Sequence, residues 1–311
     1  MLKIRSKIIN TIKYRITNIA CALLSKHPPL FSAIEIETVN RCNGSCSFCP
    51  VNKGAETRPY AKMHDNLFKK IINELAEINY SGYLGIQSNN EPLLDKDIIL
   101  KLRMAKEKCP SAKLYMYTNG TLLTVEKMGL ILDAGVDSVT IDNYSDQLVM
   151  HHNLREIDNY YRSKNDRRYL EKVNISVQGE NVIRTNRGGE APNKKGIDYN
   201  EYHNYQNIGC LFPVKQMVIR PDGKTSLCCN DALGKVTLGD VSSQSLLEVW
   251  SGEKYKNLRK ELKENGRINL TVCKNCDVFK VEKSDINLIY NRLLGKDIKV
   301  VSSKITVSSR I

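Results

Sequence analysis

Three cysteines on one short segment are the residues of this sequence best placed to do chemistry. Cys42, Cys46 and Cys49 follow a C-x₃-C-x₂-C spacing. Three thiolates at this spacing can hold three irons of a [4Fe–4S] cube, and they leave the fourth iron without a protein ligand. A reactive centre needs an open coordination position, because a fully ligated centre is usually structural or only transfers electrons. We therefore expect a reactive iron–sulfur cluster on this segment.

Zinc binding and unrelated buried thiols are the alternatives for this segment. A zinc ion would require a fourth ligand close by, and the one candidate, His64, lies beyond a basic, glycine-containing stretch. The iron–sulfur interpretation is therefore favoured. Two further cysteines, Cys21 and Cys109, stand alone, and we interpret each as a small buried hydrophobic residue.

A second group of cysteines lies in the C-terminal part of the chain. Its members are Cys210, Cys228, Cys273 and Cys276, with Cys229 directly after Cys228. Four such thiols can hold one further cluster. A C-x₂-C pair is also common in zinc sites, so structural zinc is the alternative. A cluster with four thiolate ligands has no open iron, and we therefore expect it to transfer electrons or to stabilise the fold.

From Ile34 to Gln178 the chain alternates between predicted strands and predicted helices. The predicted strands are Ile34–Asn40, Tyr83–Ser88, Lys113–Thr118, Ser138–Tyr144 and Val173–Gln178. The predicted helices are Asp65–Tyr80, Asp97–Lys108, Thr124–Ala134 and roughly residues 150–171. This alternation predicts βαβ units and a parallel sheet. Because the pattern stops well short of an eightfold barrel, the predicted fold class is α/β, with a partial, open parallel β/α barrel of about five to six strands.

The predicted topology also places the reactive cysteines. Cys42 follows the strand Ile34–Asn40, so its loop lies at the C-terminal end of a parallel strand, where α/β folds carry reactive groups. Beyond the barrel, Gln216–Ile219 and Lys224–Cys228 flank a Pro-Asp-Gly turn and predict a β-hairpin. Two predicted helices follow the hairpin, Ser245–Trp250 and Lys254–Lys263. These elements indicate a small α+β domain.

We therefore divide the chain into four parts. A basic amphipathic N-terminal helix occupies residues 1–33, and the partial barrel occupies residues 34–205. The auxiliary-cluster domain occupies residues 206–285, and a C-terminal tail occupies residues 286–311.

The net charge of +13 is concentrated near the N-terminus. Residues 1–26 contain six Lys and Arg side chains and no acidic side chain. Apolar residues recur there at helical spacing, namely Ile4, Ile8, Ile12, Ile16, Ile19 and Leu23. Such a helix could pack on the body of the protein or lie on an anionic membrane surface. Because the rest of the chain is only moderately basic, the charge predicts a local anionic partner rather than nucleic acid.

The bulk properties predict the compartment. The 311 residues contain no run of about 18 apolar residues that could span a bilayer and no secretory signal pattern. Ten cysteines that cluster as ligands, rather than pair as disulfides, fit a reducing environment. We expect a cytoplasmic enzyme, peripheral at the inner membrane surface if residues 1–26 bind lipid.

The segment around the first cysteines resembles the motif of the radical S-adenosylmethionine (SAM) superfamily, with Phe48 in the aromatic position before the last cysteine. In that family, SAM chelates the open iron through its amine and carboxylate. One electron then cleaves SAM to methionine and a 5′-deoxyadenosyl radical, which abstracts a substrate hydrogen. The resemblance implies SAM as a cofactor, a SAM-binding [4Fe–4S] cluster, and a reductant such as flavodoxin or ferredoxin.

The same resemblance implies several SAM contacts. The family has a Gly-Gly-Glu-Pro-like motif after its second strand, and here both glycines are replaced, by Asn89 and Asn90. Glu91 keeps the carboxylate that would pair with the SAM amine. The alternative for Glu91 is a carboxylate that starts a turn or a helix. Further candidates for contacts with SAM lie at the ends of later strands, namely Asn119, Asp142, Ser176 and Gln178; Asp142 could instead contact the substrate.

The second cysteine group, with the sequence around it, resembles the SPASM/Twitch extension of radical SAM enzymes. A full SPASM domain holds two auxiliary clusters and needs seven or more cysteines, whereas this region has five. The resemblance therefore implies the Twitch form, with one auxiliary [4Fe–4S] cluster. Cys228 aligns with the family's ligand, and Cys229 is a surplus thiol that could substitute for it.

A partial barrel with one auxiliary cluster is similar to Twitch-type radical SAM dehydrogenases, which oxidise a cyclitol alcohol to a ketone. We therefore expect a radical dehydrogenase of a sugar, cyclitol or glycoconjugate alcohol, with the auxiliary cluster as electron acceptor. Arg187, after the fifth strand, could bind this small-molecule or glycan substrate or assist its deprotonation; the alternative is a solvated loop arginine. A lipid-linked substrate would explain the basic helix.

Two other functions compete with this one. Radical SAM enzymes that modify ribosomally made peptides, by thioether formation or epimerisation, often carry an extra peptide-binding module. The 33 residues before the predicted barrel are too few for such a module. An iron–sulfur redox carrier is the other alternative, and the open first site disfavours it.

Overall fold

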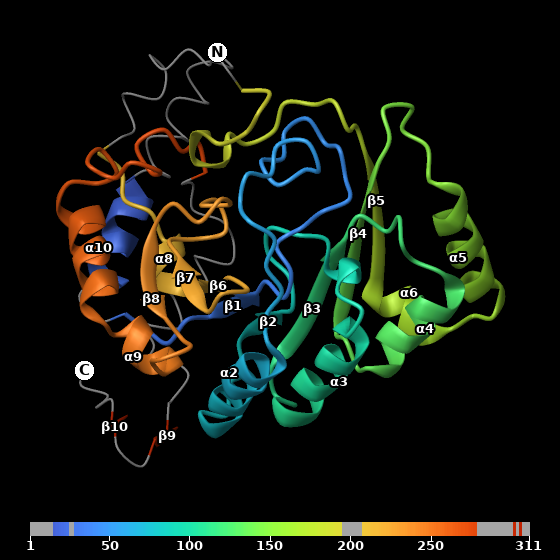
Figure 1. The fold of residues 1–311 in the computed structure, drawn as a ribbon, viewed down its shortest axis with the longest axis horizontal. Coiled ribbons are helices and arrows are strands. Elements are labelled where there is room, and N and C mark those ends of the chain that lie inside the picture. The colour runs from blue at the N-terminus through green and yellow to red at the C-terminus, as the bar shows by residue number, and fades with distance from the viewer. Residues whose placement is uncertain (1–14, 25–27, 195–206, 279–300, 303–304, 307–311) are drawn as a thin grey trace.

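The computed structural model describes residues 15–24, 28–194 and 207–278, and the short pairs 301–302 and 305–306. Its main feature is one open sheet of eight strands in the order β5-β4-β3-β2-β1-β6-β7-β8 (Figure 1). The strands are β1 Ala33–Ile36, β2 Tyr83–Gly85, β3 Lys113–Thr118, β4 Ser138–Tyr144, β5 Val173–Gln178, β6 Gln216–Ile219, β7 Lys224–Ser226 and β8 Thr237–Asp240.

The first six strands of this sheet are parallel, and the last two run antiparallel to their neighbours. The sheet does not close, because β5 and β8 lie at opposite edges. This architecture confirms the predicted α/β fold with an open parallel barrel. The predicted hairpin is also present, because β6 and β7 pair across a turn in which Gly223 has a φ of +83°.

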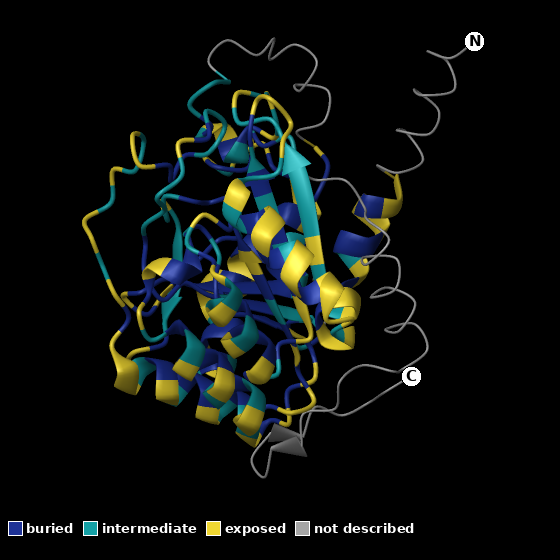
Figure 2. Ribbon diagram, turned by 90° about the vertical axis from the view of Figure 1, so that its right-hand side faces the viewer, coloured by how far each residue is buried: buried dark blue, intermediate teal, exposed yellow. Residues whose placement is uncertain are grey.

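Helices connect successive parallel strands. They are α2 Asp65–Glu77, α3 Ile98–Lys108, α4 Val125–Asp133, α5 His152–Ser163 and α6 Arg167–Lys172. These helices lie along the outer face of the sheet (Figure 1), and they turn their exposed sides outward and their buried sides toward the strands (Figure 2). Side-chain caps define several starts: Thr124 accepts from the third residue of α4, and Asp166 from the first turn of α6.

Shorter elements complete the fold. They are the 3₁₀ turns η1 Pro92–Leu94 and η2 Arg187–Gly189, the helices α8 Phe212–Lys215, α9 Leu246–Trp250 and α10 Glu253–Glu264, and a separate two-stranded pair, β9 Val301–Ser302 and β10 Ile305–Thr306. A capping box between Ser245 and Glu248 starts α9. Since β6 pairs directly with β1, the region after the barrel continues the same sheet.

Three strands are shorter than the sequence pattern predicts. β7 ends at Ser226 rather than at Cys228. β1 ends at Ile36 and β2 at Gly85, although the apolar patterns continue to Asn40 and Ser88. The residues after β1 and β2 leave the sheet and form the loops that line the site. The helical stretch predicted over residues 150–171 is two helices, because Asn165 has a φ of +49° and Asp166 begins a new helix.

The N-terminal helix is visible over residues 15–24, and its buried side differs from the apolar stripe seen in the sequence. Ala20, Cys21 and Leu24 are buried against the body of the protein, whereas Ile19 is 60% exposed. Ile16 and Leu23 are also exposed, at 40% and 50%. Both isolated cysteines, Cys21 and Cys109, are buried as predicted. The predicted helical residues 1–14 and 25–26 lie outside the described residues. Within the described part of the chain, no helix is long and apolar enough to cross a membrane.

Candidate active site

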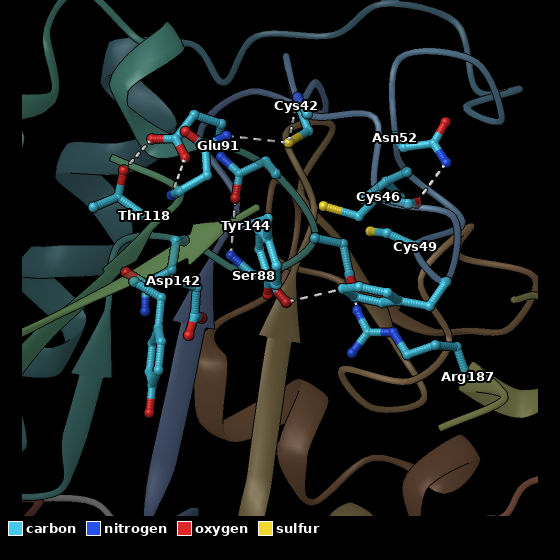
Figure 3. Close-up of a pocket in the computed structure, with 18 of the residues that line it drawn as sticks. Cys42, Cys46, Cys49, Asn52, Ser88, Glu91, Thr118, Asp142, Tyr144 and Arg187 are labelled. Carbon is cyan, nitrogen blue, oxygen red and sulfur yellow. Dashed lines mark hydrogen bonds between the residues drawn. The ribbon is translucent and has the colours of Figure 1, made fainter. Parts of the chain in front are cut away.

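A cavity of about 380 Å³ opens at the C-terminal edge of the parallel strands. Its wall includes the cysteine loop after β1, the segment after β2, the end of β3 and residues of β4 (Figure 3). Loop residues after β5 close the remaining side. This volume is in the usual range for a small-molecule site.

The three cysteines of the first group meet in this cavity. Cys42, Cys46 and Cys49 all line it, and their sulfur atoms point toward the same space (Figure 3). The Gly44 amide donates a hydrogen bond to Cys42 Sγ at 3.3 Å. A Cβ at Gly44 would lie 3.4 Å from that sulfur, an ordinary van der Waals contact, so the loop passes close to the thiol without requiring glycine.

The environment of these thiols fits an iron–sulfur cluster. Burial raises the pKa of the Cys42 thiol to about 11 and that of Cys46 to about 12. Cationic irons would reverse this effect, because a metal ion stabilises a bound thiolate. Within the described residues, no three Cys, His, Asp or Glu side chains converge on a point that a single metal ion could occupy. A four-iron cluster holds each thiolate on a different iron and so needs them further apart.

The cysteine loop is held by residues that the sequence did not single out. Asn52 Nδ2 donates to the Cys46 carbonyl at 2.9 Å, while its side-chain oxygen accepts from the amides of Gly54 and Ala55. From the other side, Ser45 Oγ donates to a carboxylate oxygen of Glu180. No local pattern reveals Asn52, since its partners depend on how the loop folds back.

Glu91 lines the cavity and is almost fully buried, at 1% exposure. Its carboxylate accepts from Thr118 Oγ1 at 2.7 Å, from the Asn119 amide at 2.7 Å and from the Leu93 amide at 3.0 Å. The last bond caps η1, so Glu91 does start a helical turn. Burial raises the pKa of Glu91, and the hydrogen bonds from Asn119, Thr118 and Leu93 oppose that shift.

Asn119 and Asn90 also line the cavity. Asn119 Nδ2 donates to Asn43 Oδ1 at 2.8 Å and approaches Cys42 Sγ at 3.8 Å, so it joins the end of β3 to the cysteine loop. Asn90 Oδ1 accepts from the Ser88 amide, while its buried Nδ2 has no partner among the described residues.

Phe48 and Asp142 lie on two sides of the cavity, together with Tyr144 and Arg184. The Phe48 ring packs edge-on against Tyr144, with 5.5 Å between centroids. The Arg184 guanidinium lies over the Phe48 ring at 4.9 Å. Burial raises the pKa of Asp142, and the charge of Arg184 opposes that shift. Arg184 and Tyr144 were missed because their contacts depend on the tertiary structure.

Ser176 is not a direct part of the cavity wall. It pairs with Asp142 in the β4–β5 register, and Gln178 Nε2 donates both to Ser176 Oγ at 2.7 Å and to Asp142 Oδ1 at 3.0 Å. Ser176 and Gln178 thus reach the cavity through Asp142.

Arg187 enters the cavity from the loop after β5. Its Nη2 donates to Asn89 Oδ1 at 2.5 Å. Its φ is +51°, a conformation that is rare for residues other than glycine and that clusters at functional sites. The preceding Asn186 fixes this loop, because its amide donates to the Asp277 carboxylate at 2.9 Å.

Gln87 is a cavity residue that sequence reasoning missed. It is 4% exposed, and both polar atoms of its amide lack a partner among the described residues. An unpaired buried polar group costs about 1–3 kcal/mol, so a ligand or water is expected there. The sequence offered no signal for it beyond its place after a strand.

The second cysteine group also comes together. Cys210, Cys228, Cys273 and Cys276 are each at most 8% exposed. Cys228 lies close enough to the other three for their charges to act on it, and its pKa is well above its usual value, chiefly because of burial. Cys229 also acts on Cys228, and burial raises the pKa of Cys229 itself to about 12, with the charge of Glu35 adding to that shift and the charges of Arg187 and Lys215 opposing it.

Arg267 holds the loop that carries two of these thiols. Its Nη1 donates to the carbonyl oxygens of Cys273, at 3.2 Å, and Cys276, at 2.5 Å. Its Nε donates to the Ile208 carbonyl at 3.1 Å, which brings the Cys210 segment alongside. This arginine was another residue missed from the sequence.

The sequence matches two known family models. The radical SAM superfamily model matches residues 36–174. The SPASM model, described as an iron–sulfur cluster-binding domain, matches residues 210–277. These matches span both cysteine groups, and the chain belongs to the radical SAM superfamily as an enzyme with a SPASM-type domain.

Individual relatives and solved structures are also similar to this chain. The chain is 26% identical over 256 residues to S-adenosyl-L-methionine-dependent 2-deoxy-scyllo-inosamine dehydrogenase of Niallia circulans, covering 82% of this chain and 96% of the relative. The crystal structure of BtrN in complex with AdoMet and 2-DOIA is similar with a TM-score of 0.67 and 27% identity, over 80% of this chain and 94% of that one. The structure of hexahistidine-tagged anSMEcpe with bound AdoMet shares only the fold, with a TM-score of 0.52 and 13% identity, over 86% of this chain and 96% of that one.

These comparisons confirm the predicted cofactors and the predicted class of reaction. The chain is a radical SAM oxidoreductase that uses SAM, a SAM-binding [4Fe–4S] cluster and an auxiliary iron–sulfur cluster. The roles of individual residues remain predictions.

Proposed function

We propose that this enzyme oxidises a secondary alcohol of a cyclitol or sugar to a ketone. One observation carries the proposal: two consecutive residues connect the radical site with the auxiliary-cluster site. Arg187 lines the cavity beside the first cysteines, while Gly188 packs directly against Val272, the residue before Cys273. A substrate in this cavity is therefore close to both the source of the radical and the site that can accept an electron.

The first cysteine group would hold a cluster that, when loaded, supplies the electron for cleavage of SAM to methionine and a 5′-deoxyadenosyl radical. Around it, Glu91 would accept a hydrogen bond from the ammonium group of SAM. Asn90 and Asn119 would orient the methionyl part of SAM. Phe48 would contact the adenine, and Asp142, supported by Ser176, would bind the ribose. The support for these roles is that all but Ser176 line the same cavity.

The second cysteine group would hold the auxiliary [4Fe–4S] cluster through Cys210, Cys228, Cys273 and Cys276. This full set of thiolates leaves no open iron, so the group suits electron transfer. The loop after β5 would fix its distance from the substrate. Gly188 has a φ of +68°, and a Cβ there would lie 2.6 Å from a methyl group of Val272, so only glycine lets the loop pack this closely.

Arg187 and Gln87 would bind the alcohol. The guanidinium offers donors to hydroxyl oxygens, and the unpaired Gln87 amide offers one donor and one acceptor in a buried position. Adjacent hydroxyl or amino groups on a ring present the complementary pattern. The relative that acts on 2-deoxy-scyllo-inosamine makes an aminocyclitol the first compound to test.

The test is an anaerobic assay of the reconstituted protein with SAM and reduced flavodoxin or ferredoxin. 2-Deoxy-scyllo-inosamine and a series of cyclitols and sugars, deuterated at the carbinol carbon, serve as substrates. We expect deuterium in 5′-deoxyadenosine and one ketone formed for each 5′-deoxyadenosine. If 5′-deoxyadenosine forms but no alcohol of the series yields a ketone, the proposal is wrong.

We further propose that the exposed stripe of the N-terminal helix binds an anionic membrane surface and so brings the enzyme to lipid-linked substrates. Ile16, Ile19 and Leu23 face solvent on residues 15–24, and the basic residues of segment 1–26 complement anionic lipids. The full chain should co-sediment with phosphatidylglycerol vesicles more than with phosphatidylcholine vesicles.

A matched pair of variants tests the stripe. Changing Ile16, Ile19 and Leu23 together to Gln should abolish binding to the anionic vesicles. The control Leu100→Gln changes a leucine of α3 that is 61% exposed, and it should bind as the wild type does. Equal binding by all three proteins contradicts the proposal.

A further inference from the structure

Oxidation of an alcohol requires an acceptor for the hydroxyl proton. In the proposed reaction, the carbon hydrogen would leave as an atom to the 5′-deoxyadenosyl radical, and the remaining electron would pass to the auxiliary cluster. The hydroxyl proton must go to a base. Arg187 lies in the cavity, but a guanidinium stays protonated in proteins and cannot take up a further proton. Another group must therefore accept it.

Glu35 of β1 lies one hydroxyl group away from the cavity. Its Oε2 accepts from Ser88 Oγ at 2.7 Å, and Ser88 lines the cavity. Its Oε1 accepts from Tyr115 Oη at 3.1 Å and from Gln216 Nε2 at 3.0 Å. Three side chains from three other segments thus converge on this carboxylate, and of these hydrogen-bond partners Ser88 lines the cavity.

Ser88 has the chemistry of a relay. A hydroxyl donates one hydrogen bond and accepts two. Ser88 donates to Glu35, and Asn89 Nδ2 approaches its oxygen only at 3.4 Å. The Ser88 oxygen can therefore accept from a hydroxyl group in the cavity while its own proton points at Glu35.

The other titratable groups near Glu35 are poorer acceptors. Burial, together with the charge of Glu35, raises the pKa of Tyr115, so it stays a phenol and donates. Burial also raises the pKa of Tyr117, and it raises the pKa of Cys229 to about 12. Burial raises the pKa of Glu35 itself, while Ser88, Tyr115, Arg187 and Gln216 oppose that shift. A carboxylate with a raised pKa is a stronger base, which suits proton transfer near neutral pH.

We propose that Ser88 and Glu35 form the proton exit of the reaction, an inference that rests on the proposed function. As the substrate hydroxyl gives its proton to Ser88 Oγ, the Ser88 proton moves to Glu35 Oε2. The O–H bond of the substrate breaks, a carboxylic O–H bond forms on Glu35, and Ser88 ends as it began. With the hydrogen atom on 5′-deoxyadenosine and the electron on the auxiliary cluster, the ketone is complete. Glu35 returns its proton to solvent between turnovers.

The test compares Glu35→Gln, Ser88→Ala and Ser88→Thr with the wild type, using the alcohol of the series above that the wild type oxidises fastest. Glu35→Gln and Ser88→Ala should still transfer deuterium to 5′-deoxyadenosine, but ketone formation should fall by about 100-fold or more. Ser88→Thr keeps the hydroxyl and should restore most of it. In Glu35→Gln, KM for the alcohol should change little, because Glu35 lies behind Ser88 and is not among the residues that line the cavity.

The pH profile separates a proton acceptor from a structural residue. In the wild type, ketone formation should fall as the pH decreases through the raised pKa of Glu35, because the protonated carboxyl cannot accept. This acidic limb should disappear in Glu35→Gln. Tyr115→Phe removes one hydrogen bond to Glu35 but leaves the route open, so it should keep the limb.

The outcomes are distinguishable. If the wild type makes a ketone and Ser88→Ala makes as much with the same pH profile, the relay is wrong and the proposed function stands. Ser88→Ala leaves the other two contacts of Glu35 in place, so it decides the question even if Glu35→Gln does not fold. If the wild type oxidises none of the alcohols, both proposals fail together.

Discussion

The two cysteine groups of this enzyme differ in ways that match two kinds of iron–sulfur chemistry. The first group has three thiols on one loop, and Cys42 and Cys49 are only partly buried beside an open cavity. The second has four buried thiols from three separate segments, and Arg267 holds two of the backbone carbonyls. The first arrangement would leave an iron of its cluster accessible to a ligand, whereas the second would enclose its cluster. The contrast teaches that ligand number and access, rather than cluster type, separate radical generation from electron acceptance.

Removing a thiol from the first group should have the largest effect. Cys46→Ala should form no detectable 5′-deoxyadenosine, because the reactive cluster loses one of only three protein ligands. Iron should fall from about eight to about four per chain, since the auxiliary cluster stays. Iron and SAM-cleavage assays on the same sample measure both. Undiminished 5′-deoxyadenosine in this variant would contradict the assignment of the reactive site.

Removing a thiol from the second group should separate the two steps. Cys276→Ala should also lose about four irons per chain, but it should still cleave SAM and transfer deuterium from the substrate. Ketone formation should be nearly lost, because the electron has no acceptor. A variant that forms the ketone at the wild-type rate would show that the auxiliary group has a structural role.

A substitution in the loop between the groups should weaken substrate binding. Arg187→Lys keeps the charge but loses the planar set of donors, so KM for the alcohol should rise about 10- to 100-fold. SAM cleavage without substrate should be unchanged, and this serves as the control. Steady-state kinetics of ketone formation give the measurement. An unaltered KM would contradict the proposed role of Arg187 in binding the substrate.

The smallest effect is expected at the surplus thiol. Because Cys228 is the proposed ligand and Cys229 the surplus thiol, Cys229→Ser should keep its iron and activity within about twofold of the wild type. The neighbouring Cys228→Ser should lose about four irons. Iron analysis of the two variants identifies the ligand. If Cys229→Ser loses the iron and Cys228→Ser keeps it, Cys229 is the ligand.

Much of this structure could be predicted because local sequence patterns determine its strands and helices. Four strands have the predicted bounds, namely Lys113–Thr118, Ser138–Tyr144, Val173–Gln178 and Gln216–Ile219. The helices follow apolar periodicity and clear caps such as Thr124. The N-terminal helix shows the limit of this reasoning: its apolar stripe predicted one face, but Ile19 on that face is 60% exposed while Ala20 is buried. Small residues allow closer packing, so the interface uses a face that hydrophobicity alone did not indicate.

The sequence by itself determined the cysteine spacings, the alternation of strands and helices, and hence the cofactors and the superfamily. Local chain geometry is enough for these features, since a C-x₃-C-x₂-C loop places its thiols within a few residues of one another. Only the tertiary structure decided which polar groups meet inside the barrel. Glu35 contacts Ser88, Tyr115 and Gln216, which lie 53, 80 and 181 residues away in sequence. The pairing of β1 with β2 and β6 sets these contacts, and no local pattern encodes that register.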